Sequence, residues 1–192
     1  MSRGNLTMIT PDNIILCGFM GTGKTTVGKI VASRLNWRFA DTDHLIERKQ
    51  GRTVSAIFAE DGEAAFRKLE SEMVATLRHV RCMVIATGGG ILLNPDNRDS
   101  LQRSGLVICL DAPADEIVAR LAAYTDRPLL AAPDPKGRIA ELLAVRDSAY
   151  AAIQHHVNTS GRTPEQIAEA VLSLRETMRN VQEDAKLSNS GR

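Results

Sequence analysis

The segment from Gly18 to Thr25, Gly-Phe-Met-Gly-Thr-Gly-Lys-Thr, fits the phosphate-binding pattern G-x-x-x-x-G-K-[S/T]. The glycines allow successive backbone N–H groups to surround phosphate oxygens, and the start of a helix adds partial positive charge. The Lys24 ammonium can bridge the β- and γ-phosphates, while the Thr25 hydroxyl can ligate Mg²⁺. The loop therefore predicts binding of a nucleoside triphosphate.

Two carboxylates, Asp41 and Asp43, stand at the end of a short predicted strand, Arg38–Asp41. Open α/β sheets bind ligands at the carboxyl ends of their strands. One carboxylate can organise Mg²⁺ while the other accepts a proton from an attacking hydroxyl. Capping of the next predicted helix, His44–Gln50, is the structural alternative for the same residues.

Two further sets of residues have both a structural and a functional interpretation. Arg67 and Glu70 are spaced i,i+3 on a predicted helix, where a solvated ion pair would explain them. The glycines at 88–90 follow a predicted strand, and such glycines favour a ligand that approaches the backbone closely. That strand ends in Thr87, where a Walker B strand would usually carry an Asp. With no guanine-reading Asn-Lys-x-Asp motif in the chain, a small-molecule kinase fits best.

Composition excludes several classes of protein. The 192 residues are 43% hydrophobic and 24% charged, which suits one folded domain with a sizeable core. A net charge of +1 gives no general attraction to nucleic acid or to an anionic membrane. The three cysteines, an odd number without Cys-x-x-Cys spacing, indicate free thiols in a reducing compartment. We therefore expect a cytoplasmic protein.

Short apolar segments alternate with amphipathic segments, which predicts a parallel sheet covered on both faces. The predicted strands are 13–17, 38–41, 82–87, 106–110 and 157–159, and the predicted helices are 24–35, 44–50, 54–60, 63–80, 96–104, 115–121, 136–150 and 164–178. The fold class is α/β, a single three-layer α/β/α domain with about five parallel strands and a P-loop kinase architecture like that of nucleoside monophosphate kinases. We expect a flexible arm at 1–12, the kinase domain at 13–179 with a lid at about 123–135, and a disordered tail at 180–192.

Taken together, the motifs resemble those of the shikimate kinase family, over roughly residues 13 to 174. The matching motifs, in the family's order and approximate spacing, are the P-loop, Asp41-x-Asp43, Phe66-Arg67-x-x-Glu70, Gly88-Gly89-Gly90, Arg127-Pro128-Leu129-Leu130 and Arg146-x-x-x-Tyr150. The resemblance implies ATP-dependent phosphorylation of the 3-hydroxyl of shikimate, in aromatic amino-acid biosynthesis through chorismate. It implies shikimate and ATP as substrates and one Mg²⁺ per subunit.

The resemblance also assigns roles to individual residues. The implied catalytic residues are Asp43, Lys24 and Arg127. The implied ATP-binding residues are Gly21, Thr22, Gly23, Lys24, Thr25, Thr26, Arg120, Arg127 and Arg162, with Arg120 and Arg162 flanking the adenine. The implied shikimate-binding residues are Asp43, Arg67, Glu70, Gly88, Gly89, Gly90 and Arg146, with the two arginines as a carboxylate clamp. Thr25, together with Asp41 through water, would hold the Mg²⁺.

The segment Tyr150–Thr159 departs from the family pattern. It is about one residue shorter than the family implies and carries Asn158 where an Asp is usual, on the adenine side. His155 and His156 are adjacent there, but neighbouring residues on a strand point to opposite faces, so we expect an ordinary strand start rather than a metal site.

Several alternatives remain open. Arg146 lies on the apolar stripe of its predicted helix, and an internal salt bridge to Asp43 or Glu70 would also explain it. The whole chain could be a kinase for another sugar acid such as gluconate, or a non-catalytic nucleotide-binding module. We expect a monomer that binds neither nucleic acid nor membrane.

Overall fold

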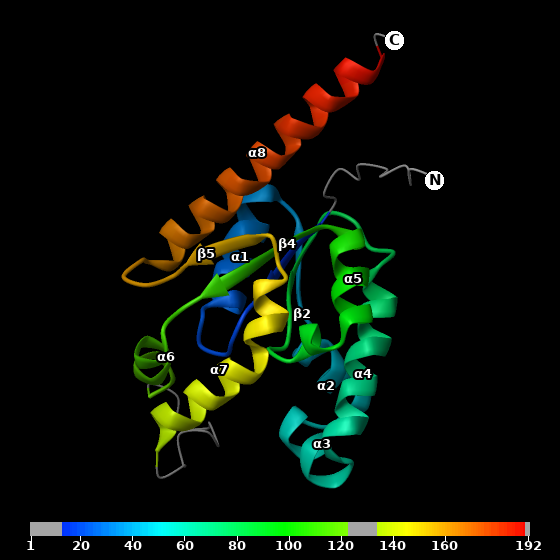
Figure 1. Ribbon diagram of the computed structural model, residues 1–192. Coiled ribbons are helices and arrows are strands. Elements are labelled where there is room, and N and C mark those ends of the chain that lie inside the picture. Colours follow the sequence, from blue (N-terminus) through cyan, green and yellow to red (C-terminus); the bar gives the residue numbers. More distant parts are fainter. Residues whose placement is uncertain (1–12, 123–133, 191–192) are drawn as a thin grey trace, which may run out of the picture.

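The computed structural model describes residues 13–122 and 134–190. Within these ranges five parallel strands form one sheet in the order β2-β3-β1-β4-β5. Figure 1 shows α8 along one side of the molecule, with α4 and α5 on the other. The strands are β1 (Asn13–Cys17), β2 (Arg38–Asp41), β3 (Met83–Ala86), β4 (Leu106–Asp111) and β5 (His155–Asn158). The helices are α1 (Lys24–Leu35), α2 (Thr42–Gln50), α3 (Val54–Glu60), α4 (Gly62–Leu77), α5 (Pro95–Ser104), α6 (Ala114–Leu121), α7 (Pro135–Ala151) and α8 (Pro164–Ser190), with a 3-10 turn, η1 (Ile91–Leu93).

Every residue of β1 and β3 is buried, because helices cover both faces of the sheet. On one face, Ile14 and Leu16 of β1 pack with residues of α1 and α8, such as Val27 and Val171. On the other face, Ile15 packs with residues of α2 to α7. Each fully buried aliphatic side chain of this kind contributes about 1.5–3 kcal/mol. The predicted three-layer α/β/α fold with a parallel sheet is confirmed.

The strand order determines where ligands can bind. β1 is central, and it is hydrogen-bonded to β3 on one side and to β4 on the other. The chain moves from β1 towards β2 and β3 on one side, and later to β4 and β5 on the other. Loops that leave neighbouring strands in opposite directions open a crevice at the carboxyl edge, which is where ligands bind in such sheets. The loops after β1, β2 and β3 carry the motifs singled out above.

Most element boundaries lie within three residues of those predicted; the predicted helix 63–80, for example, ends at Leu77. The last strand and the last helix differ in ways that matter more. The last strand is His155–Asn158 rather than 157–159, because pairing with Ile108–Asp111 of β4 sets its register. Helix α8 continues to Ser190, through residues where we expected an unstructured tail. Its apolar stripe fades near Met178, but Arg179 forms ion pairs with Glu176 and Glu183 that support a polar helix.

The predicted arm at 1–12 lies outside the described residues. So does the predicted lid, except that Asp134 and Pro135 form the start of α7, where the Asp134 side chain accepts a hydrogen bond from the Gly137 N–H. Among the described helices, none combines the length and apolar character needed to cross a membrane.

Candidate active site

The phosphate loop joins β1 to α1, as its sequence predicts. Gly18, Gly21 and Gly23 all have positive φ angles, and a Cβ at Gly18 would also collide with the Leu110 carbonyl of β4. The Thr22 hydroxyl donates to the Phe19 carbonyl at 2.8 Å and fixes the bend of the loop. The N-terminal end of α1 thus opens directly onto the carboxyl edge of the sheet, where Thr25 and Thr26 form its first turn.

The Lys24 side chain folds back along this loop. Its ammonium donates to the carbonyls of Gly18 and Phe19, at 2.9 and 2.8 Å. Burial lowers the pKa of Lys24, and the nearby Asp43 carboxylate opposes that shift. The carbonyls hold the cation at the mouth of the loop, where an anionic phosphate would be a stronger partner.

Thr25 and Asp41, the two predicted metal ligands, lie together. The Thr25 hydroxyl donates to Asp41 Oδ2 at 2.8 Å, across the gap between α1 and β2. The other oxygen, Asp41 Oδ1, accepts from the Asp43 N–H at 3.1 Å and caps α2. The capping and ligand interpretations of Asp41 are therefore compatible, because each uses a different oxygen. A hydroxyl beside a carboxylate is the kind of oxygen donor pair that Mg²⁺ prefers.

The residues predicted to bind the acceptor include three buried polar atoms without a partner among the described residues. They are Asp43 Oδ1, Glu70 Oε1 and Arg146 Nη1, none of which has a hydrogen-bond partner among the described residues. An unsatisfied buried polar atom costs about 1–3 kcal/mol, so such atoms are uncommon in a folded protein. Three of them at one sheet edge, from three different helices, indicate a site that a polar ligand completes.

The three glycines at 88–90 explain how these side chains converge. A Cβ at Gly88 would fill the space occupied by Asp43 and Glu70, one at Gly89 would lie 2.9 Å from Arg146 Nη1, and one at Gly90 would collide with the Arg67 guanidinium. The Gly88 N–H donates to the Thr42 hydroxyl at 2.9 Å, and the Tyr150 hydroxyl donates to the Gly89 carbonyl at 2.6 Å. These bonds hold the glycine turn against the acceptor side chains.

The Arg67–Glu70 pair is not the solvated pair that spacing alone would suggest. Arg67 Nη1 donates to Glu70 Oε2 at 2.7 Å, and only 1% of the Glu70 side chain is exposed. Burial raises the pKa of Glu70, and the Arg67 charge opposes that shift. Glu63 accepts from the other side of the guanidinium, at 2.8 Å from Nη2. Two carboxylates thus fix the orientation of Arg67.

Arg146 has no ion-pair partner in the part of the chain that the structure describes. Within the described residues no carboxylate forms an ion pair with it, so neither salt bridge considered above, to Asp43 or to Glu70, is present. Its guanidinium carbon lies 5.0 Å from the centre of the Phe19 ring, a cation–π contact that positions the group.

Asp43 has an environment suited to proton transfer. Burial raises its pKa to about 6, the neighbouring Asp41 adds to the shift, and Lys24 opposes it. A carboxylate with this pKa is ionised at neutral pH and still basic enough to accept a proton.

The two arginines predicted to flank the adenine, Arg120 and Arg162, differ in their contacts. The Arg120 guanidinium donates to the Thr159 hydroxyl and carbonyl, both at 2.9 Å, to Glu116 at 2.8 Å, and to the Gly21 carbonyl at 3.3 Å. Arg162 is exposed, and its backbone N–H donates to the Thr159 carbonyl at 3.3 Å. Arg120 therefore contacts the P-loop, whereas the Arg162 side chain forms no hydrogen bond or ion pair among the described residues. Arg127 lies outside the described residues.

Thr42 and Phe19 belong to the site but were not predicted. Thr42 is fully buried, and in the sequence it stands between Asp41 and Asp43. A hydroxyl residue directly after a strand is the sequence signal that could have identified it. Phe19 occupies a variable position of the P-loop, where only the structure reveals its contact with Arg146.

Comparison with known proteins agrees with the resemblance found in the sequence. Residues 20–176 match the family model described as shikimate kinase. A shikimate kinase of Caldanaerobacter subterraneus subsp. tengcongensis is 46% identical over 160 residues, which is 83% of this chain and 94% of that relative. A shikimate kinase of Thermodesulfovibrio yellowstonii is 43% identical over 168 residues, covering 88% and 97% of the two chains.

Solved structures give the same result. The shikimate kinase of Acinetobacter baumannii in complex with shikimate superposes with a TM-score of 0.82 at 36% identity, covering 88% of this chain and 94% of that one. A gluconokinase of Sinorhizobium meliloti shares the fold, with a TM-score of 0.62 at 16% identity over 92% and 98% of the two chains. The family match and the identity of the relatives lead to one conclusion. This chain belongs to the shikimate kinase family.

Proposed function

We propose that this chain transfers the γ-phosphoryl group of ATP to the 3-hydroxyl of shikimate, giving shikimate 3-phosphate and ADP for aromatic amino-acid biosynthesis. The observation that carries the proposal is the group of three unpaired buried atoms on Asp43, Glu70 and Arg146, beside the glycine turn. A compact ligand with a carboxylate and vicinal hydroxyls would supply hydroxyl donors for the two carboxylate oxygens and a carboxylate acceptor for the guanidinium nitrogen.

The shikimate carboxylate binds the guanidinium groups of Arg67 and Arg146. A guanidinium offers parallel N–H donors that match the two oxygens of a carboxylate. Glu70 fixes Arg67 through the 2.7 Å bond, and Phe19 supports Arg146 from beneath. Gly88, Gly89 and Gly90 leave room for the carboxylate and guanidinium groups to converge on the ligand. The substrate charge is then paired with an arginine that has no other countercharge among the described residues.

Asp43 accepts the proton during the transfer. The 3-hydroxyl gives its proton to Asp43 as its oxygen bonds to the γ-phosphorus, and the bond from that phosphorus to the bridging oxygen of ADP breaks. The raised pKa of Asp43, about 6, suits a base that is ionised before the step. Lys24 moves from the loop carbonyls to the β- and γ-oxygens and stabilises the charge that develops there.

Thr25, Asp41 and the backbone of the phosphate loop would hold Mg²⁺ and the nucleotide. Thr25 and Asp41, 2.8 Å apart, provide oxygen ligands that fit Mg²⁺, Asp41 through water. When bound, the ion neutralises charge on the β- and γ-oxygens. The backbone N–H groups of Gly21, Thr22, Gly23, Lys24, Thr25 and Thr26 receive the phosphates, Arg120 and Arg162 flank the adenine, and Arg127 reaches the transferring group.

A kinase for an open-chain sugar acid is the main alternative, because the gluconokinase of Sinorhizobium meliloti has the same fold. The two arginines and the glycine turn favour a cyclic carboxylate. A coupled assay of ADP release with shikimate and with gluconate separates the two substrates. We expect turnover with shikimate only. Turnover with neither would support a nucleotide-binding module instead, and turnover with gluconate alone would contradict the proposal.

The same proposal includes a cytoplasmic location and a monomeric state. Three free cysteines suit a reducing compartment, which supports a cytoplasmic protein. The monomeric state stays a prediction, and size-exclusion chromatography with light scattering would test it.

A further inference from the structure

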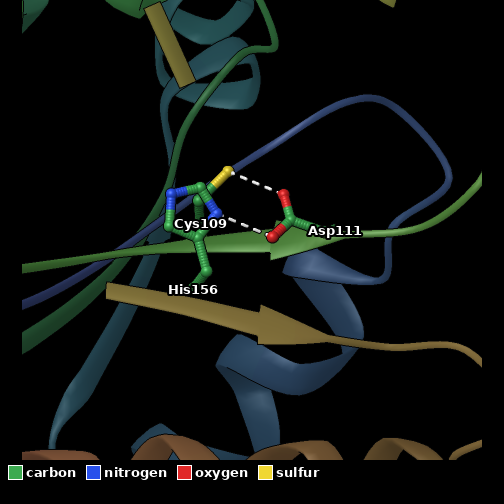
Figure 2. A group of neighbouring side chains, drawn as sticks. All are labelled: Cys109, Asp111 and His156. Atoms are coloured by element: carbon green, nitrogen blue, oxygen red, sulfur yellow. Dashed lines mark hydrogen bonds and ion pairs between the residues drawn. The ribbon is translucent and has the colours of Figure 1, made fainter. Parts of the chain in front are cut away.

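A second group of side chains with metal-ligand chemistry lies at the other end of the sheet from Asp41. The register of β4 and β5 pairs Cys109 with His156, and Asp111 follows two residues along β4 on the same face. Figure 2 shows the three side chains pointing toward one another. Cys109 Sγ is 3.3 Å from Asp111 Oδ1, and His156 Nδ1 is 2.7 Å from Asp111 Oδ2. All three ligand atoms lie within 4.8 Å of one another.

The histidine ring is oriented by a backbone group. His156 Nε2 lies 3.0 Å from the Ile153 carbonyl, which can only accept, so Nε2 carries a proton. In the neutral ring Nδ1 is then an acceptor, and it faces a carboxylate oxygen that is also an acceptor. Two acceptors 2.7 Å apart require a cation, either a proton on Nδ1 or a metal ion held by both groups. A backbone carbonyl on the far nitrogen is the usual outer partner of a metal-binding histidine.

Cys109 supplies the third ligand. Its side chain is fully buried, with Cys17 directly opposite on β1. The Cys17 thiol, burial and Asp111 all raise the pKa of Cys109, so without an ion it is a neutral thiol that donates to Asp111. A bound metal ion deprotonates a coordinating thiol. By contrast, 44% of the Asp111 side chain and 36% of the His156 side chain are exposed, which leaves a path for an ion and room for a water ligand.

We propose that Cys109, Asp111 and His156 form a binding site for a divalent transition-metal ion of the Zn²⁺ type, separate from the Mg²⁺ of the kinase reaction. One sulfur, one nitrogen and one oxygen donor suit Zn²⁺, with water in the fourth position, whereas Mg²⁺ prefers oxygen ligands only. On binding, the S–H bond of Cys109 breaks, its proton leaves to solvent, and the sulfur lone pair binds the ion without any change of oxidation state. The ion would join the edge strand β5 to β4.

The inference does not depend on the substrate of the kinase, so we test it without nucleotide or shikimate. Chelator-treated protein is titrated with Co²⁺, and the thiolate-to-cobalt charge-transfer absorption is recorded; Zn²⁺ is then added to displace the Co²⁺. We expect one equivalent of Co²⁺ to produce the absorption and Zn²⁺ to abolish it. Co²⁺ bound only at Thr25 and Asp41 would give no such absorption, since those ligands are oxygens.

Variants with matched controls localise the ion. We expect Cys109→Ser to lose the charge-transfer absorption and His156→Gln to weaken Co²⁺ binding at least about tenfold, since even an outer partner of a ligand has an effect of that size. The controls, Cys82→Ser and His155→Gln, replace an exposed cysteine and the histidine next to His156, and should bind as the unmodified chain does. Because His156 is exposed, its variant still tests the proposal if Cys109→Ser fails to fold.

Two results would contradict the proposed metal site. One is the absence of charge-transfer absorption in the folded, unmodified protein at several equivalents of Co²⁺, which would leave a plain His156–Asp111 ion pair. The other is equal absorption and affinity in His156→Gln and in His155→Gln. Neither result bears on the shikimate assay, so this inference and the proposed function fail or survive separately.

Discussion

The proposed acceptor side of the site, with Asp43, Glu70 and Arg146, differs from the proposed adenine side, with Arg120, in how its charged groups are paired. On the acceptor side, Asp43, Glu70 and Arg146 each keep a buried polar atom without a partner among the described residues. On the adenine side, Arg120 has four hydrogen bonds, and together they tie α6 to Thr159 and to the P-loop. The fold thus leaves buried polar groups unpaired in the first region and pairs the Arg120 guanidinium in the second.

The difference indicates where the fold gives up stability for function. Unpaired buried groups destabilise the empty protein but are ready to bind a polar ligand. Satisfied groups stabilise the empty protein and gain little from a ligand. Substitutions on the acceptor side should therefore affect activity far more than stability, or even improve stability. Substitutions of Arg120 should do the reverse.

Asp43→Asn should have the largest effect on activity. We expect kcat to fall by about 10²–10⁴, because the amide cannot accept the proton. The free energy of unfolding near pH 7.5 should rise by about 1–3 kcal/mol, because the native state no longer holds a buried carboxylate whose pKa is raised to about 6. Steady-state kinetics and urea unfolding measure the two effects. A less stable variant with normal kcat would contradict both assignments.

The pH dependence follows from the same shift. Between the ordinary pKa of 3.8 and the raised value of about 6, the native state binds more protons at Asp43 than the unfolded state does. This group therefore makes the free energy of unfolding fall as pH rises through that window. The stability gap between Asp43→Asn and the unmodified chain should widen from about pH 4 to about pH 7, as urea unfolding would show. kcat/KM, which reports the ionisation of the free enzyme, should fall about tenfold per pH unit below about pH 6.

Lys24→Met should have the next largest effect. The ammonium is placed to stabilise charge on the transferring phosphoryl group, so kcat should fall by about 10²–10³. The melting temperature should change little, because the hydrogen bonds lost are two contacts to loop carbonyls and the variant also removes a buried charge. Kinetics and thermal unfolding test this. Turnover near that of the unmodified chain would exclude the phosphate role.

Arg120→Lys should have the smallest effect on activity. Lysine cannot keep bonds to Thr159, Glu116 and Gly21 together, so we expect a loss of about 1–2 kcal/mol of stability, or a few degrees in melting temperature. The KM for ATP should rise by less than about threefold. A large rise in the KM for ATP without loss of stability would show that Arg120 serves mainly to bind nucleotide. It would contradict the proposed difference between the two sides of the site.

The parts of this site that were predictable are those carried by backbone chemistry and by order along the chain. The P-loop needs glycines with positive φ angles, and alternation of apolar and amphipathic segments predicts a parallel sheet, so both are visible in sequence. The environment of Glu70 was not visible, since i,i+3 spacing to Arg67 looks the same whether the pair is solvated or buried. The proposed metal ligands Cys109 and His156 meet only because of the register between β4 and β5. The sequence predicts that β5 starts at residue 157, two residues later than it does, so this pairing could not be predicted.

The measurement that most directly tests the acceptor-side account is calorimetric titration of shikimate into the unmodified chain, Arg146→Lys and Arg120→Lys. Arg146 has an unpaired Nη1, and lysine cannot reproduce a two-pronged contact with a carboxylate. We predict that Arg146→Lys weakens shikimate binding at least about tenfold, or about 1.4 kcal/mol, with nearly unchanged melting temperature and ATP affinity, while Arg120→Lys keeps shikimate affinity. Normal shikimate affinity in a destabilised Arg146→Lys protein would contradict the account, because Arg146 would then be a structural residue.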